Sequence, residues 1–359
     1  MQVEDPAAAP TGAVVHLHAA LSTEDLAIMD ALWHGFPTHR ESIRAQRRST
    51  RRPITFSPDL VPRADAVRNF RRTGGRLGRR SEPWPVLRAR TTYFRDEYVY
   101  GHMITARGIE RVLRNESLAE AAKSLYGCPV VVPYNSYGNL LLPGQELGLH
   151  TDVPAFRGVD RSTLPLWMLV VMRHSGLFER WRIRIATAVL FLGGCQGGEF
   201  VCYPEGASSQ SAQIRPQTGA AVVLDADTIF HGVDRISGDD SPMRSVGEGA
   251  MQLFNKGNRS WRLRVVDPGA GSPESVRCFD YHSEEMRFTL SWKAYCFPDD
   301  SARRQWTEKS DDLRPESIVG ALVEDLCERG ALTKRDHPLS DTELATLMID
   351  TFVRFPSSA

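Results

Sequence analysis

The sequence predicts a mainly β protein with helical flanks, an α+β fold built around a sandwich or barrel. Between Val130 and Phe297, short runs of β-branched and aromatic residues are separated by Gly, Pro, Asn and Asp, which is typical of many short strands joined by turns. Helical spacing of apolar residues appears instead towards the two ends of the chain. We therefore expect one domain, with an N-terminal helical and arginine-rich region (1–129), a β core (130–298) and C-terminal helices (299–359).

The composition is that of a soluble globular protein. At 359 residues and 42% hydrophobic, the chain can bury a substantial core. No apolar run approaches the roughly 20 residues that cross a bilayer, and the acidic start Met1–Asp5 is unlike a signal peptide, so we expect a cytoplasmic location and no membrane partner. The six cysteines have no Cys-x-x-Cys spacing, which favours reduced thiols over disulfides.

Helices are predicted where apolar residues recur at helical spacing between capping residues. Ser22 is a good N-cap for a helix that Gly35 and Pro37 end, and Gly127 ends a second helix that begins at Glu116. Two C-terminal helices are expected to pack against the β core, Ser317–Arg329 and Ser340–Phe352.

Strands are predicted from short apolar runs. Val14–His18 is expected to add a short edge strand. The predicted core strands are Val130–Tyr137, Leu147–Thr151, Leu166–Arg173, Ile183–Leu192, Glu199–Tyr203, Ala220–Leu224, Ile229–Val233, Trp261–Val266 and Arg287–Phe297.

Positive charge is concentrated between Arg40 and Arg90, although the formal net charge of the whole chain is zero. Little apolar periodicity is present there, so we expect mostly loop or lid. The charge admits two interpretations, a surface paired with the acidic C-terminal region or a surface that binds an anionic substrate. Nucleic acid is disfavoured as a partner, because aromatic residues for base stacking are sparse in the segment.

A His-x-Asp pair, His150 and Asp152, and a distant His231 form the candidate metal site. In an extended strand, residues two apart share a side, so His150 and Asp152 are expected to point the same way. Two imidazoles and one carboxylate on one face leave the opposite face of a metal open, which is typical of non-haem Fe(II) oxygenases. The same residue types also bind zinc, so a non-redox, cupin-like zinc module is the alternative from another class.

The surroundings of these residues resemble the Fe(II)/2-oxoglutarate-dependent dioxygenase superfamily across roughly Val130 to Phe297. The resemblance implies a double-stranded β-helix (jelly-roll, cupin-like) core with iron held by His150, Asp152 and His231. It lies in four features that occur in the family's order: Pro143–Asp152, Gly197-Gly198-Glu199-Phe200, Tyr203-Pro204, and Thr218–Leu224 before His231.

The resemblance also requires a basic residue that binds the far carboxylate of 2-oxoglutarate. Arg287 and Thr289 fit the family's Arg-x-Ser/Thr on the last core strand, and a guanidinium fork suits a carboxylate. Arg287, however, lies much further from the second histidine than is usual, so a long insertion, 234–286, must intervene; it is expected to add a strand pair or to shape the pocket. Arg244 and Arg235 stay open as alternatives to Arg287.

Two further residues are candidates for contact with the cosubstrate. Asn135-Ser136-Tyr137 is similar to the Asn-x-Tyr of the plant-type branch of the family, although a strand Asn and a core Tyr explain Asn135 and Tyr137 equally well. Of the remaining histidines, His102, His174 and His282 are each expected to lie outside the site.

The resemblance implies an oxygenase that uses Fe(II), 2-oxoglutarate and O2 to oxidise an unactivated C–H bond of a small molecule, with release of succinate and CO2. Hydroxylation is the expected outcome, and specialised metabolism a fitting context. Asp152 disfavours halogenation, because halogenating members have a small residue there. A hydroxylase of peptide or protein side chains is the alternative within the family, and an anionic small molecule is one option for the substrate.

Overall fold

The computed structural model describes residues 14–35, 38–40, 83–247, 249–267, 276–333 and 341–356. Most of the arginine-rich segment, the predicted helix stop Pro37 and the predicted cap Ser340 therefore lie outside the described residues. Within the described part of the chain, no helix is long and apolar enough to cross a membrane. All six cysteines are free thiols, as expected.

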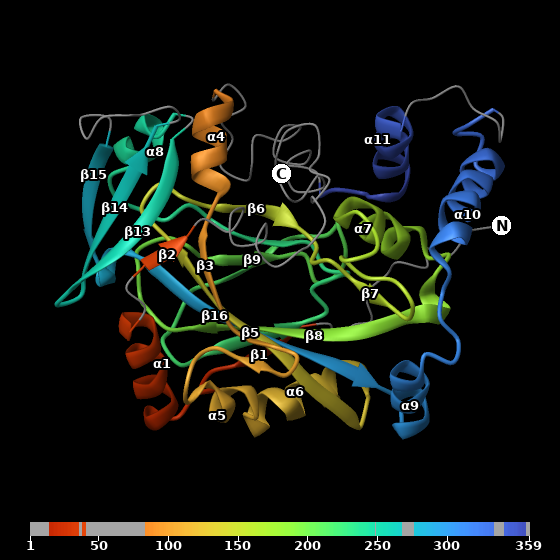
Figure 1. The fold of residues 1–359 in the computed structure, drawn as a ribbon, viewed down its shortest axis with the longest axis horizontal. Coiled ribbons are helices and arrows are strands. Elements are labelled where there is room, and N and C mark those ends of the chain that lie inside the picture. Colours follow the sequence, from red (N-terminus) through yellow and green to blue (C-terminus); the bar gives the residue numbers. More distant parts are fainter. Residues whose placement is uncertain are drawn as a thin grey trace.

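Two antiparallel sheets form the core, seen as the lower and upper layers in Figure 1. The larger sheet has the order β1 (Val14–Leu17), β11 (Ala221–Leu224), β8 (Arg182–Phe191), β16 (Arg287–Phe297), β5 (Val130–Leu141), β3 (Phe94–Tyr100) and β4 (Met103–Ile104), and β7 (Ala155–Phe156) pairs with β8. The smaller sheet has the order β10 (Ala212–Ile214), β9 (Phe200–Cys202), β12 (His231–Val233) and β6 (Leu147–His150).

The path of the chain between these sheets is that of a jelly roll. Strands β5, β8, β11 and β16 lie side by side in the larger sheet, and the strands that separate them in sequence, β6, β9, β10 and β12, make the smaller one. Each pair of neighbours is antiparallel. The predicted α+β fold with a double-stranded β-helix core is confirmed, and β1 is the predicted edge strand.

The insertion between the second histidine and Arg287 supplies three strands of a third sheet at one end of the molecule, and Thr38–Arg40 supplies the fourth (Figure 1). Its order is β15 (Val276–His282), β14 (Ser260–Val266), β13 (Ala250–Gly257) and β2 (Thr38–Arg40), and α8 (Ser241–Ser245) precedes it. The expected strand pair is therefore extended by two strands. The Trp33 ring stacks on Phe288 with ring centroids 4.3 Å apart and on Trp261 at 5.8 Å, which ties this sheet to the start of β16.

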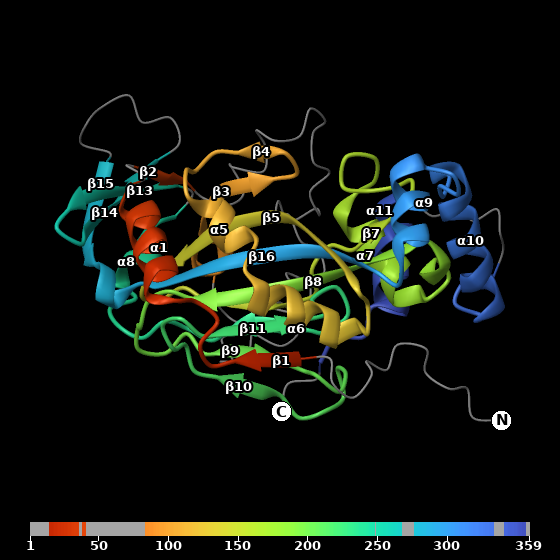
Figure 2. The same cartoon turned by 90° about the horizontal axis from the view of Figure 1, so that it is seen from below.

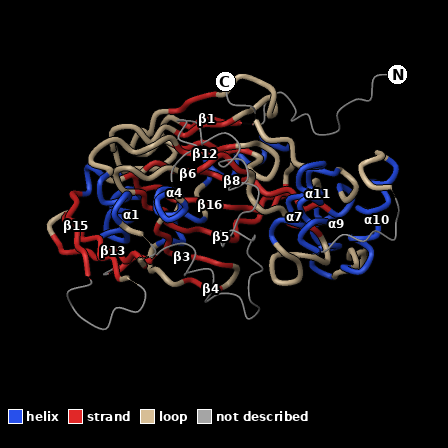
Figure 3. The backbone as a smooth tube through the Cα atoms, turned by 90° about the horizontal axis from the view of Figure 1, so that it is seen from above, coloured by secondary structure: helices blue, strands red, loops and turns tan. Residues whose placement is uncertain are grey.

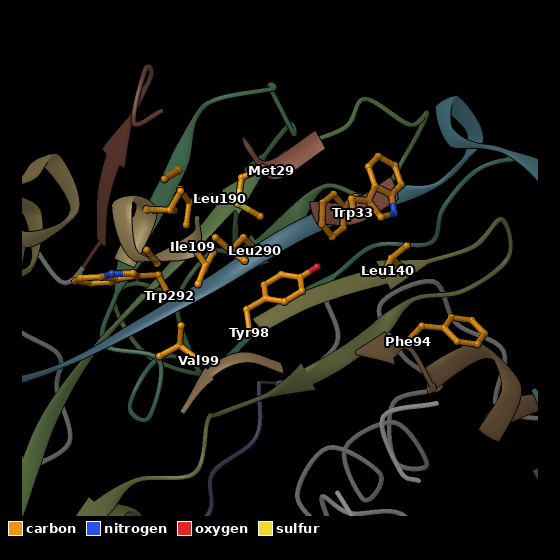
Figure 4. Close-up of a cluster of buried hydrophobic side chains, with 14 of the residues drawn as sticks. Met29, Trp33, Phe94, Tyr98, Val99, Ile109, Leu140, Leu190, Leu290 and Trp292 are labelled. Carbon is orange, nitrogen blue, oxygen red and sulfur yellow. The ribbon is translucent and has the colours of Figure 1, made fainter. Parts of the chain in front are cut away.

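Three helices cover the outer face of the larger sheet, as Figure 2 shows from below: α1 (Thr23–Gly35), α5 (Ile109–Leu113) and α6 (Glu116–Tyr126). The buried side chains between helices and sheet include Trp33, Tyr98, Leu290 and Trp292 (Figure 4). Because side chains alternate along a strand, β16 turns Leu290 and Trp292 towards these helices and the intervening residues towards the smaller sheet.

The caps of two of these helices follow the sequence. Ser22 and Asp25 exchange hydrogen bonds at the start of α1, and Gly127 ends α6 with a φ of 61°, in the left-handed region that glycine tolerates best. The first turn of α6 is capped by Asn115, whose side chain accepts from the Leu118 N–H at 3.0 Å.

A helical layer lies at the end opposite the third sheet (Figure 3). The expected C-terminal helices are present as α10 (Pro315–Glu328) and α11 (Asp341–Phe352), after α9 (Asp300–Glu308), and they share a buried cluster with α7 (Leu166–Ser175) and with Val201 and Phe230 of the smaller sheet. The 3-10 turns Glu179–Trp181 and Ser283–Glu285 complete the described elements.

Two expectations were wrong. Leu166–Arg173 was predicted as a strand and is helix α7, buried over two turns between α11 and the smaller sheet, where an apolar run suits either structure. Two residues of the sequence indicate a helix here: Pro165, before the first turn, and Gly176, which follows the last turn with a φ of 75°. Part of the expected loop at 40–90 is also helical, as α4 (Trp84–Thr91), which begins at a proline pair.

Candidate metal and cosubstrate site

The two histidines of the predicted triad are cross-strand neighbours in the smaller sheet. His150 ends β6 and His231 begins β12, and the antiparallel register places them opposite each other, with ring centroids 4.4 Å apart. Asp152 follows two residues after His150, and its backbone N–H donates to the Ala226 carbonyl at 2.7 Å. One potential ligand atom from each of the three side chains lies within 4.8 Å of the other two, and all three residues are buried.

The hydrogen bonds of the two rings leave the same nitrogen for a metal. Nδ1 of His150 donates to the Gly148 carbonyl at 2.7 Å, and Nδ1 of His231 donates to the Ile229 carbonyl at 2.9 Å. A backbone acceptor on Nδ1 fixes the tautomer in which Nε2 carries the electron pair that can bind a metal. Two imidazole nitrogens and one carboxylate converge here, which is the donor set that suits Fe(II).

Asp152 is also held by a lysine that the sequence analysis did not single out. Lys293 Nζ donates to Asp152 Oδ2 at 2.6 Å and to Thr187 Oγ1 at 3.1 Å, whereas Asp152 Oδ1 faces His150 Nε2 at 3.9 Å. One carboxylate oxygen is thus bonded to Lys293, and the other faces the histidines. The signal was present in the sequence, since Lys293 is the one charged residue within the apolar run that follows Arg287.

A cavity of about 140 Å³ joins the triad to the inward-facing residues of the larger sheet. On β16 these are the polar residues that alternate with the buried core, from Arg287 through Thr289 and Ser291 to Lys293. Strand alternation therefore brings the predicted cosubstrate residues Arg287 and Thr289 into the same space as the predicted metal ligands.

Arg287 is buried and only partly paired. Its Nε donates to the Gly198 carbonyl at 2.9 Å and its Nη1 to Thr289 Oγ1 at 3.4 Å, but Nη2 has no hydrogen-bond partner among the described residues. Burial lowers the pKa of Arg287 to about 10, because the charged form is poorly solvated there. An unpaired, buried guanidinium N–H suits a carboxylate ligand, which fits the resemblance to 2-oxoglutarate enzymes.

The alternatives to Arg287 lie elsewhere. Arg244 lies on α8, is largely exposed and pairs with Asp240. Arg235 donates to Glu146 Oε2 at 2.8 and 3.0 Å, so its guanidinium already has a carboxylate partner. Neither residue lines the cavity.

Asn135 and Tyr137 both line the cavity from β5, next to β16. Asn135 Oδ1 is buried without a hydrogen-bond partner among the described residues. Arg95 lies over the Tyr137 ring, with its guanidinium carbon 3.5 Å from the ring centroid. Arg95 was not singled out in the sequence, because no motif surrounds it.

His102, His174 and His282 lie outside the triad. His102 is exposed in the turn between β3 and β4, and His282 is exposed before a 3-10 turn. His174 lies in the last turn of α7, where burial lowers its pKa to about 3, and its Nε2 lies 3.5 Å from Thr151 Oγ1. It therefore supports the loop between the first two triad residues as a neutral ring.

A buried ionic cluster lies behind that loop. Arg182 Nη2 donates to Asp225 at 2.7 and 2.8 Å and to Asp227 at 3.1 Å. Burial, with the neighbouring Asp225 adding to it, raises the pKa of Asp227 to about 7 against the opposing effect of Arg182. The cluster anchors the segment whose Ala226 carbonyl accepts from the Asp152 N–H.

No protein-family model and no curated protein sequence matches the chain. Among solved structures, similar ones include a 2OG-Fe(II) oxygenase family oxidoreductase from Burkholderia pseudomallei (12% identity, TM-score 0.40, covering 79% of this chain and 85% of that one). A prolyl-4-hydroxylase from Pseudomonas putida has 13% identity and a TM-score of 0.34, covering 80% of this chain and 93% of its own.

HygX from Streptomyces hygroscopicus, solved with nickel, 2-oxoglutarate and hygromycin B, has 9% identity and a TM-score of 0.34, and the match covers 80% of this chain and 84% of HygX. Identities and TM-scores this low leave the chemistry of this chain to be argued from its own residues.

Proposed function

We propose that this protein is an Fe(II)- and 2-oxoglutarate-dependent oxygenase that hydroxylates an unactivated C–H bond of a small-molecule substrate. The observation that carries the proposal is one cavity that holds both the His150–Asp152–His231 cluster and the partly unpaired guanidinium of Arg287. The cluster supplies the ligands for the metal, and Arg287 supplies the complement to a carboxylate.

Each residue has a distinct part in this proposal. His150, Asp152 and His231 hold the metal from one side, so that its other side faces the cavity. Arg287, with Thr289, orients the cosubstrate through its far carboxylate. When bound, Fe(II) and 2-oxoglutarate supply O2 activation, coupled to conversion of the cosubstrate into succinate and CO2.

The arginine separates this function from that of a zinc module. Two histidines and an aspartate also suit zinc, but a zinc module has no need of an arginine that binds 2-oxoglutarate. A buried guanidinium that lacks one hydrogen-bond partner is costly unless a ligand completes it. A carboxylate of the bound cosubstrate would supply the hydrogen-bond partner that Arg287 lacks among the described residues.

Anaerobic absorption spectroscopy tests the proposal. Addition of Fe(II) and 2-oxoglutarate to the purified chain should produce the weak visible charge-transfer band of the chelate, and exposure to O2 should then release succinate. The Asp152→Ala variant is the control and should show neither. A metal-loaded protein that gives no band with 2-oxoglutarate contradicts the cosubstrate assignment. A screen of small molecules and peptides for stimulated succinate release then identifies the substrate class.

A further inference from the structure

We propose that Arg95 forms a second anion-binding subsite in the same cavity and holds a carboxylate or phosphate group of the substrate. The inference rests on the proposed function, which assigns Arg287 to the cosubstrate. It makes the substrate a small molecule with at least one anionic group.

Arg95 faces the cavity from the strand next to β5. On β3 it is the register partner of Asn139, which is in turn the partner of Thr289 on β16. These three residues form one row across the sheet, and all of them line the cavity. The Arg95 side chain is only 10% exposed, and its guanidinium carbon lies 3.5 Å from the centroid of the Tyr137 ring.

Arg95 is less closely paired with a carboxylate than two other buried arginines of the described chain, Arg90 and Arg182. Arg90 donates to Asp240 at 3.0 Å, and Arg182 donates to Asp225 at 2.7 Å. The only carboxylate contact of Arg95 among the described residues is Glu97 Oε1 at 3.4 Å, and the Glu97 side chain is 37% exposed. A charge-assisted bond is normally shorter than 3 Å, so the contact with Glu97 is weak. Burial lowers the pKa of Arg95, but Tyr137, Tyr93 and Glu97 outweigh this effect and raise it, and the Tyr93 side chain also hydrogen-bonds to Arg95. Arg95 is therefore a cation that is held mainly by phenol groups rather than by a close carboxylate.

Arg95 and Arg287, which both line the cavity, lie on opposite sides of β16. The guanidinium of Arg287 is bonded to the Gly198 carbonyl and lies 5.7 Å from the ring centroid of Phe191, on the β8 side. The guanidinium of Arg95 lies over Tyr137, on the β5 side. Strands in a sheet are spaced by about 4.8 Å, so the two cations are positioned to bind two separate anionic groups.

Polar atoms next to Arg95 extend the subsite. Asn139 Nδ2 donates to Ser291 Oγ at 3.0 Å, but its Oδ1 is buried without a hydrogen-bond partner among the described residues. The same is true of Asn135 Oδ1, further along the same strand. Both can accept from hydroxyl or amine groups, so the subsite suits a polar, anionic small molecule better than an apolar one.

Binding of simple anions to the loaded protein tests the inference. The protein is first loaded with 2-oxoglutarate and with Mn(II), which serves as a redox-silent metal. Calorimetry then measures its titration with inorganic phosphate and, separately, with acetate. At least one of them should bind saturably, and the stronger binder identifies the group. Arg95→Gln should weaken that binding about 10-fold or more, and Arg95→Lys should weaken it less, because the charge remains.

The 2-oxoglutarate titration of the same variants keeps the two proposals apart. Arg95→Gln should change the Kd for 2-oxoglutarate less than about twofold, whereas Arg287→Gln should raise it about 10-fold or more. Two results would overturn the subsite. One is that Arg95→Gln binds the anion as tightly as the wild type does, and the other is that neither anion binds saturably to the wild type. A loss of 2-oxoglutarate affinity in Arg95→Gln equal to that in Arg287→Gln would assign Arg95 to the cosubstrate instead.

If the wild type binds no 2-oxoglutarate, the proposed function fails, and the phosphate and acetate titrations of the Mn(II) protein alone still report on Arg95. Thermal unfolding of each variant shows whether it folds. If Arg95→Gln does not fold, Arg95→Lys carries the comparison, since it keeps the charge and loses the planar fork over Tyr137. If Arg95→Gln does not fold and Arg95→Lys binds the anion as tightly as the wild type does, the planar guanidinium of Arg95 is not needed for anion binding.

Discussion

The ammonium group of Lys293 lies 2.6 Å from Oδ2 of Asp152, while Oδ1 of the same carboxylate faces His150. The Lys293 and Asp152 side chains are each 11% exposed, so water screens the attraction between their charges only weakly. Lys293 therefore does two things for the triad: it neutralises Asp152 when no metal is bound, and it keeps one carboxylate oxygen directed towards the histidines. Groups that orient a metal ligand in this way commonly affect metal affinity strongly.

Replacing Lys293 by Met should weaken metal binding about 10-fold or more, because Asp152 loses the contact that orients it. The metal-free variant should also unfold more easily, by about 3 kcal/mol, since a buried carboxylate is left without its partner. Titration of the apo protein with Mn(II) and urea unfolding with and without metal measure the two effects. Tyr295→Phe, two residues further on the same face, is the control. Unchanged Mn(II) affinity would show that Lys293 does not position Asp152.

Replacing Arg287 by Gln should raise the Kd for 2-oxoglutarate about 10- to 100-fold, the usual worth of a hydrogen bond to a charged group. Metal binding should be unaffected, because Arg287 contacts none of the triad residues among the hydrogen bonds described above. Arg244→Gln is the matched control, since Arg244 is exposed on α8 and outside the cavity. Calorimetry on the Mn(II) protein compares the variants. A larger loss in Arg244→Gln than in Arg287→Gln would reverse the assignment.

The sequence was informative where short spacing and strand alternation determine geometry. His150 and Asp152 are two residues apart, and Arg287 and Thr289 alternate with core residues on one long strand, so their sides could be predicted. His231, the third residue of the predicted triad, lies far from the other two in sequence, and its position opposite His150 is a cross-strand register that no local pattern specifies.

The rest depended on tertiary contacts. Arg95 reaches the cavity only because β3 adds to the edge of the sheet beside β5, and nothing near it in sequence indicates that pairing. The helix Leu166–Ser175 was taken for a strand because burial on all sides removes the periodicity that distinguishes the two structures. Its terminal Pro165 and Gly176 were the better guide.

Replacing Gly198 by Ala should weaken 2-oxoglutarate binding and destabilise the fold together. Gly198 has a φ of 70°, and a Cβ there would lie 2.5 Å from Ile236 Cδ1 and 3.0 Å from Arg287 Cδ. The added methyl group would displace the arginine whose Nε donates to the Gly198 carbonyl. Calorimetry with 2-oxoglutarate and thermal unfolding measure the two losses. Gly206→Ala, at a φ of 96° with open space around its Cβ, controls for backbone strain alone.

If Gly206→Ala and Gly198→Ala unfold at similarly lowered temperatures but only Gly198→Ala loses cosubstrate affinity, displacement of Arg287 is the cause. Equal affinities in both variants would mean that the arginine adjusts to the methyl group. The comparison also explains the Gly-Gly pair of the sequence in physical terms, since Gly197 has a φ of 71° and a Cβ there would lie 2.6 Å from the Arg235 carbonyl oxygen.

The buried cluster behind the triad predicts a specific pH dependence of stability. Burial and the neighbouring Asp225 raise the pKa of Asp227 from 3.8 to about 7 in the folded state. The folded protein therefore holds this proton more tightly than the unfolded chain does. The stabilisation from the protonated form is complete below about pH 4 and is lost as the pH rises towards about 7.

Asp227→Asn removes this titration and keeps the shape of the side chain. Relative to the wild type, the variant should gain about 2 kcal/mol of unfolding free energy between about pH 5 and pH 8. Asp225→Asn should behave oppositely: burial raises the Asp225 pKa, but hydrogen bonds from Asp227 and Arg182 outweigh it and hold the pKa below the usual value. That variant should lose stability above about pH 4, where the wild-type carboxylate is charged and paired.

Urea unfolding of the chelator-treated protein at several pH values measures both trends without interference from metal binding. A difference between Asp227→Asn and the wild type that does not change with pH would show that Asp227 is ionised throughout, and hence that Arg182 neutralises both aspartates at once. In that case the triad loop would be anchored by a fully charged cluster rather than by one that shares a proton, because Asp225, Asp227 and the Ala226 carbonyl belong to the same turn.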